Sequence, residues 1–128
     1  MERLIERVTL ANKALDRLAE LAGKEAVSDV ERDALIQRFE FSYELLWKCA
    51  KDYLRVNEGL DSASPRRVIR DCHVAGLLSD EETEMALRMA ADRNLTVHTY
   101  DEDFAQKLSV RIADYAKLLR TWLDRMDR

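Results

Sequence analysis

The residues best suited to chemistry lie in one short segment, Asp92-Arg93-Asn94-Leu95-Thr96-Val97-His98-Thr99-Tyr100. An imidazole both accepts and donates protons near neutral pH, and a guanidinium binds phosphate oxygens through a planar, permanently charged group. His98 and Arg93 therefore suffice for cleaving RNA without a metal. The imidazole would promote attack of a ribose 2′-hydroxyl on the adjacent phosphorus, and the arginine would stabilise the phosphoryl charge. The competing interpretation is a helix C-terminus with an incidental histidine.

The spacing of these residues restricts how they can act together. In a straight helix, residues five apart point about 140° away from each other, so Arg93 and His98 diverge. Arg93 shares a face with Tyr100, and Asn94 shares one with His98. Arg93 and His98 converge only if the helix loosens here, or if two copies of the segment meet across a two-fold axis. The spacing therefore favours a homodimer.

The sequence lacks the motifs of several other common catalytic and metal-binding sites. The sequence has no HExxH, no glutamate three residues before either histidine, no glycine-rich phosphate loop and no zinc-type Cys/His cluster. We therefore expect neither a metal nor a cofactor. Cys49 and Cys72 lie alone in helical patterns, and we expect buried, reduced thiols. His73 is assigned no role.

Two charged groups near helix surfaces have ordinary interpretations. Glu40 and Glu44, one turn apart, are expected to be exposed, with an arginine held at a packed interface as the alternative. Arg88 has Glu84 and Asp92 one turn away on either side, which predicts a surface ladder of ion pairs.

Composition excludes several classes of protein. At 128 residues, 47% of them hydrophobic, the chain is long enough for one domain over residues 1–128. No apolar run approaches the roughly 20 residues of a transmembrane helix, and the N-terminus lacks the pattern of a signal peptide. We therefore expect a cytoplasmic protein without membrane contact. The net charge of −4 argues against non-specific nucleic-acid coating but permits a local basic site.

Glycine and proline fall only between segments with helical periodicity, and no stretch alternates with a two-residue period. Ser28 with Glu31 and Ser79 with Glu82 have the spacing of capping boxes, and Ser64-Pro65 predicts a helix start with the serine as N-cap and the proline at the first helical position. One-sided apolar stripes must be buried against each other. The first helix has a seam of Leu4, Val8, Ala11, Leu15 and Leu18, and the last has a stripe of Phe104, Leu108, Ile112, Tyr115, Leu119 and Trp122. The pattern predicts an all-α, antiparallel up-and-down bundle of four to five helices, over about residues 3–21, 28–56, 64–76, from 79 onward, and from 101 onward.

Several blocks of sequence together resemble the HEPN family, in the branch named nucleotidyltransferase substrate-binding proteins. Arg93-x4-His98-x-Tyr100 matches the R-x4-H-x-Y signature of HEPN toxins. Further similar blocks, in order along about residues 30 to 120, are Gln37-Arg38-Phe39-Glu40-Phe41 with Glu44-Leu45-x-Trp47-Lys48, Ser64-Pro65-Arg66 with Val68-Ile69-Arg70, and Ala75-Gly76-Leu77. We see no departure at the motif positions.

The resemblance implies a metal-independent endoribonuclease toxin whose site lies in a cleft between two protomers. Arg93 would stabilise phosphate, His98 would act as acid and base, and Asp92 and Asn94 would support them. The implied partner is a minimal nucleotidyltransferase (MNT) antitoxin that neutralises the toxin by transferring AMP from ATP to Tyr100. The alternative is a non-catalytic substrate-binding subunit of a two-component nucleotidyltransferase.

Overall fold

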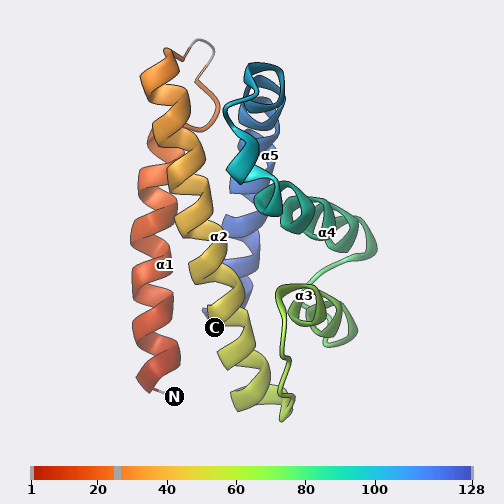
Figure 1. Cartoon of the computed structure of the whole chain (residues 1–128). Coiled ribbons are helices and arrows are strands. Elements are labelled where there is room, and N and C mark those ends of the chain that lie inside the picture. The colour runs from red at the N-terminus through yellow and green to blue at the C-terminus, as the bar shows by residue number, and fades with distance from the viewer. Residues whose placement is uncertain (1, 25–26, 128) are drawn as a thin grey trace.

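The computed structural model describes residues 2–24 and 27–127, and every regular element in these ranges is helical, as predicted (Figure 1). A short 3-10 helix, η1, separates the last two of the five α-helices in this part of the chain. The elements are α1 (Glu2–Leu21), α2 (Asp29–Glu58), α3 (Pro65–Val74), α4 (Asp80–Asn94), η1 (Thr96–His98) and α5 (Glu102–Met126).

The three long helices, α1, α2 and α5, lie side by side, and α1 runs antiparallel to the other two (Figure 1). Arg120 near the end of α5 reaches back to Asn12 and Asp16 of α1, at 2.6 and 2.8 Å. α2 and α5 run in the same direction, because α3 and α4 together carry the chain back along their side. This return path places the end of α4 against the middle of α2.

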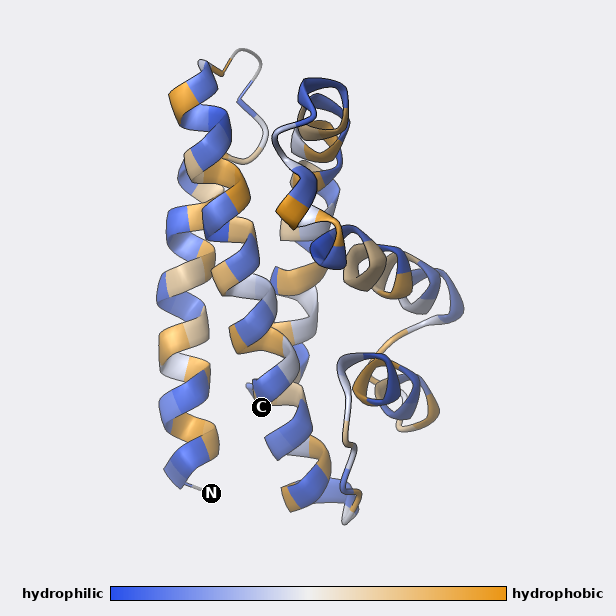
Figure 2. Cartoon of the chain, viewed as in Figure 1, coloured by the Kyte–Doolittle hydropathy of each residue, from blue (hydrophilic) through white to orange (hydrophobic). Residues whose placement is uncertain are grey.

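The core is formed by the apolar stripes that the sequence predicted. All five apolar residues of the predicted α1 seam are buried, and Phe39 of α2 stacks on Tyr115 of α5 with ring centroids 5.7 Å apart. Figure 2 shows hydrophobic and hydrophilic residues recurring along each helix, the pattern of amphipathic helices. Burying each large side chain contributes about 1.5–3 kcal/mol. Among the described helices, none is long and apolar enough to cross a membrane.

Both predicted capping boxes are present. In each, the serine hydroxyl accepts from the backbone N–H three residues on, and the glutamate there accepts from the serine N–H. Glu82 of the second box also binds Arg125 of α5 at 2.6 Å, and hydrogen bonding to that guanidinium lowers the pKa of Glu82. The beginning of α4 is thereby fastened to the end of α5.

Cys49 and Cys72 are free and buried, as predicted. Burial disfavours the charged thiolate, and it raises the pKa of each thiol from 9.0 to about 12. The folded chain therefore holds these protons at pH values where the unfolded chain releases them. The stability that follows is fully present below about pH 9 and is lost as the pH rises toward about 12.

We expect the free energy of unfolding, measured by urea titration, to be lower at about pH 10.5 than at about pH 7.5. In a Cys49→Ala/Cys72→Ala variant the two thiol titrations are removed, so its stability should fall less over the same interval. An equal fall in the variant and the unchanged chain would assign the pH dependence to other groups.

Candidate active site

The segment from Asp92 to Tyr100 changes backbone conformation partway along. α4 ends at Asn94, Leu95 caps it, and Thr96–His98 forms a single 3-10 turn before Asp101 caps α5. The helix therefore loosens here, which is one of the two conditions for convergence of Arg93 and His98, but within the described residues of one subunit the two side chains do not meet. The turn directs the side chains on either side of it to different surroundings.

Arg93 points toward α2. Its Nη1 lies 3.1 Å from Glu40 Oε2 and donates to the Thr96 hydroxyl at 2.8 Å, and its Nε lies 3.5 Å from Glu44 Oε1. Trp47 Nε1 donates a hydrogen bond to the other oxygen of Glu44, Oε2, at 3.0 Å. The Arg93 side chain is 25% exposed, and among the described residues its Nη2 has no hydrogen-bond partner. The protein thus leaves Nη2 unengaged, while Nε, although 3.5 Å from Glu44 Oε1, is buried without a hydrogen-bond partner in the part of the chain described.

These contacts correct the expectation that Glu40 and Glu44 are exposed surface carboxylates. Both are partly buried, and the alternative, an arginine held at a packed interface, is the arrangement observed. Two carboxylates around one guanidinium fix its orientation and offset its charge. Arg93 is therefore well positioned but electrostatically weaker than a free arginine.

His98 and Tyr100 lie on the solvent side of the turn. His98 Nδ1 is 3.0 Å from the Tyr100 hydroxyl, and the rings meet edge to face with centroids 5.6 Å apart. Both side chains are exposed, Tyr100 to 81%. The sequence placed His98 with Asn94 on one helix face, but the 3-10 turn pairs it with Tyr100. In the part of the chain that the structure describes, no hydrogen bond or ion pair joins His98 to Arg93.

Asp92, next to Arg93, faces the opposite way and is buried. Its two oxygens accept from Arg111 Nη1 of α5 at 2.9 and 3.1 Å, and one accepts from the Tyr115 hydroxyl at 2.5 Å. Burial of the hydroxyl is the largest cause that raises the pKa of Tyr115, and the hydrogen bond to the Asp92 carboxylate raises it further. The expected ladder with Arg88 is therefore wrong, because Asp92 is turned into the contact between α4 and α5. This contact fixes the end of α4 directly behind Arg93.

Asn94, predicted to support His98, is exposed and makes no side-chain hydrogen bond within the described chain. Four site residues outside the segment were not identified as such from sequence: Glu40, Glu44, Arg111 and Tyr115. Glu40 and Glu44 were noted only as a carboxylate pair, and Tyr115 only as part of an apolar stripe. Their contacts with the segment join helices far apart in sequence, so no local spacing indicated them.

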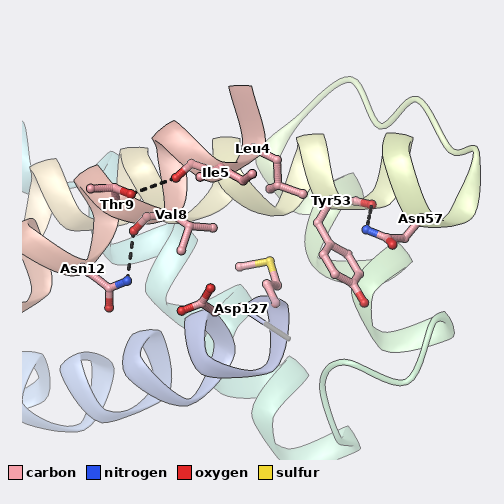
Figure 3. A pocket seen from close by; sticks show the side chains of 9 residues that line it. Leu4, Ile5, Val8, Thr9, Asn12, Tyr53, Asn57 and Asp127 are labelled. Carbon is pink, nitrogen blue, oxygen red and sulfur yellow. Dashed lines mark hydrogen bonds between the residues drawn. The ribbon is translucent and has the colours of Figure 1, made fainter. Parts of the chain in front are cut away.

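A hollow of about 290 Å³ lies away from this segment, between the start of α1 and the ends of α2 and α5 (Figure 3). Val8, Tyr53, Asn57 and Asp127 are among its lining residues, and none of the predicted site residues takes part. In residues 2–24 and 27–127, no group of three or more metal-ligating side chains could hold a metal ion.

The chain matches a family model and a curated protein. A family model described as "nucleotidyltransferase substrate binding protein like" matches residues 4–128. The chain is 31% identical over 93 residues to "Probable ribonuclease HepT" of Haemophilus influenzae (strain Rd), a match that covers 70% of this chain and 62% of that protein. The matched region thus spans less than two thirds of this curated relative.

Solved structures share the fold. A Thermus thermophilus protein superposes with a TM-score of 0.91 at 52% identity, covering 92% of this chain and 99% of that one. A tri-AMPylated HEPN toxin of Shewanella oneidensis, in complex with an MNT antitoxin, superposes with a TM-score of 0.78 at 16% identity. That match covers 97% of this chain and 96% of the toxin, and at such low identity it establishes a common fold alone.

Proposed function

The chain belongs to the nucleotidyltransferase substrate binding protein like family, and from this we propose that it is the toxin of a HEPN/MNT toxin–antitoxin pair. It is a metal-independent endoribonuclease that uses Arg93 and His98, and an MNT antitoxin neutralises it by adenylylating Tyr100. The observation that carries the proposal is the exposed His98–Tyr100 pair, 3.0 Å apart, on the turn that follows Arg93.

The Tyr100 hydroxyl can set the protonation pattern of the His98 ring. A phenol both donates and accepts, so it can accept a hydrogen bond from Nδ1–H, which leaves Nε2 of this exposed residue as an unprotonated base. Nε2 then takes the proton of a ribose 2′-hydroxyl while the O2′–P bond forms and the P–O5′ bond breaks. The leaving 5′ oxygen takes a proton from water, the imidazolium returns its proton to the solvent, and the products are a 2′,3′-cyclic phosphate and a 5′-hydroxyl.

The free Nη2 edge of Arg93 is suited to the negative charge that develops on the phosphoryl oxygens. Within one subunit Arg93 is turned toward α2, so the proposal includes a homodimer, in which the arginine of one subunit serves the imidazole of the other. Leu95, which precedes the turn, and Val97, in the middle of it, are 45% and 70% exposed. They supply apolar surface for such a contact. The proposal also includes a cytoplasmic location, because the protein would meet its RNA substrate there.

An adenylyl group on Tyr100 would add a phosphate directly beside His98. The modification replaces the phenolic hydrogen, adds negative charge and occupies the place of the RNA phosphate, so cleavage stops. An acceptor that is 81% exposed is also open to a transferase.

The test is to purify the chain alone and after co-expression with a nucleotidyltransferase partner, and to assay both for RNA cleavage in EDTA. We expect the unmodified chain to cleave RNA, and the co-expressed chain to be inactive and to have one or more adenylyl groups on Tyr100 by peptide mass spectrometry. A Tyr100→Phe chain should remain unmodified, and the partner should leave whatever RNA cleavage this variant shows alone unchanged. Modification at another residue, with Tyr100 bare, would contradict the proposed switch.

The second candidate function is a non-catalytic binding subunit of a two-component nucleotidyltransferase. The observation favouring it is that Glu40 and Glu44 already offset the charge of Arg93, which weakens that residue as a phosphate ligand. This function predicts tight binding to the partner, no adenylyl group on Tyr100 and no RNA cleavage by the isolated chain.

A further inference from the structure

Among the described residues, the only hydrogen-bond partner of the Tyr100 hydroxyl is Nδ1 of His98, at 3.0 Å. The two rings meet edge to face at an interplanar angle of 77°, and the contact with the hydroxyl is made through Nδ1. The oxygen that receives AMP in the proposed function is therefore in direct contact with a basic nitrogen of the same chain.

This contact bears on the chemistry of modification. A phenol is protonated at neutral pH and is a weak nucleophile in that form, so transfer requires a base to remove its proton. A general base must lie within hydrogen-bond distance of the proton that it takes, and His98 Nδ1 meets this condition before any partner binds. Because Tyr100 is exposed, the phosphorus of a bound nucleotide can approach its hydroxyl from the solvent side.

We propose that His98 is the general base for adenylylation of Tyr100 as well as for RNA cleavage, acting through Nδ1 in the first reaction and Nε2 in the second. This inference rests on the proposed modification of Tyr100. The Tyr100 hydroxyl donates to Nδ1 and attacks the α-phosphorus of a nucleoside triphosphate held by the transferase. The Oη–P bond forms, the bond to pyrophosphate breaks, the proton passes to Nδ1, and the imidazolium then releases it to water.

The dual role of His98 links the activity of the toxin to its modification by the transferase. A toxin that has lost His98 cleaves RNA much more slowly and is also a poor substrate for its own neutralisation. Modification then depends on an intact active site, so the transferase acts preferentially on chains able to cleave RNA.

The experiment measures the initial rate of AMP incorporation into the purified full chain, with the nucleotidyltransferase and ATP both at saturating concentrations. His98→Ala should lower this rate by roughly 100-fold, the ordinary contribution of a general base. His98→Asn places an amide near the position of Nδ1 and can still bond the hydroxyl but cannot take a proton, so it should be as slow as His98→Ala. His73→Ala, which removes the other histidine, should transfer at the unchanged rate, because that ring lies on α3 and contacts Asp80.

A ring-fluorinated tyrosine at position 100 separates base catalysis from mere positioning. Its more acidic phenol needs less help from a base, so it should raise the rate of the His98→Ala chain much more than that of the unchanged chain. Transfer to His98→Ala at the unchanged rate, or full activity of His98→Asn, would overturn the inference while leaving Tyr100 modification intact. Absence of AMP from the unchanged chain would overturn both the role of His98 as base and the modification of Tyr100. The RNA-cleavage assay would still test the proposed ribonuclease activity of that chain.

Discussion

Replacement of His98 by alanine is expected to lower the rate of RNA cleavage by roughly 10²–10⁴-fold, the range that a positioned general acid–base contributes. In the proposed reaction no other group takes the proton of the attacking 2′-hydroxyl. His98 is exposed, and within residues 2–24 and 27–127 its side chain bonds only to Tyr100, so the substitution should leave the core and the helix ends unchanged.

Single-turnover cleavage of a defined RNA, with EDTA present and protein in excess, measures this effect. His73→Ala is the matched control, since it removes the other imidazole at a site bonded to Asp80 and should cleave at the unchanged rate. Unchanged circular dichroism and thermal unfolding of His98→Ala would attribute the loss to chemistry. If His98→Ala cleaves as fast as His73→Ala, the proposed mechanism is wrong.

Asp92→Ala is expected to reduce the free energy of unfolding by about 2–4 kcal/mol, through loss of the hydrogen bonds that join α4 to α5. Asp92 is 4% exposed and accepts from Arg111 and Tyr115. The Arg111 side chain is 43% exposed and can turn to solvent when its partner is removed. The Tyr115 residue is 2% exposed, so its hydroxyl would be left buried without an acceptor.

A double-mutant cycle with Tyr115→Phe tests this reasoning by urea unfolding. Tyr115→Phe alone should cost about 1 kcal/mol, because Asp92 keeps Arg111. The double variant Asp92→Ala/Tyr115→Phe should be less destabilised than the sum of the single variants, since no buried hydroxyl is left unpaired. Strict additivity would show that the hydroxyl and the carboxylate do not interact as the structure indicates.

RNA cleavage by the same variants separates a positioning role of Asp92 from a catalytic one. Asp92 adjoins Arg93 in sequence and fixes the end of α4, so variants at Asp92 should lower cleavage even at temperatures where they remain folded. Asp92 does not reach the exposed face of His98, so the loss should be smaller than that of His98→Ala.

Much of the fold could be read from local patterns. The capping boxes at Ser28 and Ser79, and proline at the start of α3, predicted where helices begin. The apolar periodicity predicted the buried face of α1 completely. These signals involve residues three or four apart, whose interaction depends only on helix geometry and not on the rest of the chain.

By itself, the sequence determined the helices, the apolar faces and the polar segment around Arg93 and His98, because each of these depends on near neighbours. The tertiary structure alone decided what those polar side chains contact. It set Glu40 and Glu44 around Arg93, turned Asp92 to partners 19 and 23 residues away, and paired His98 with Tyr100 through a 3-10 turn. Such contacts follow from where separate helices cross and end, and no spacing within one helix specifies that geometry.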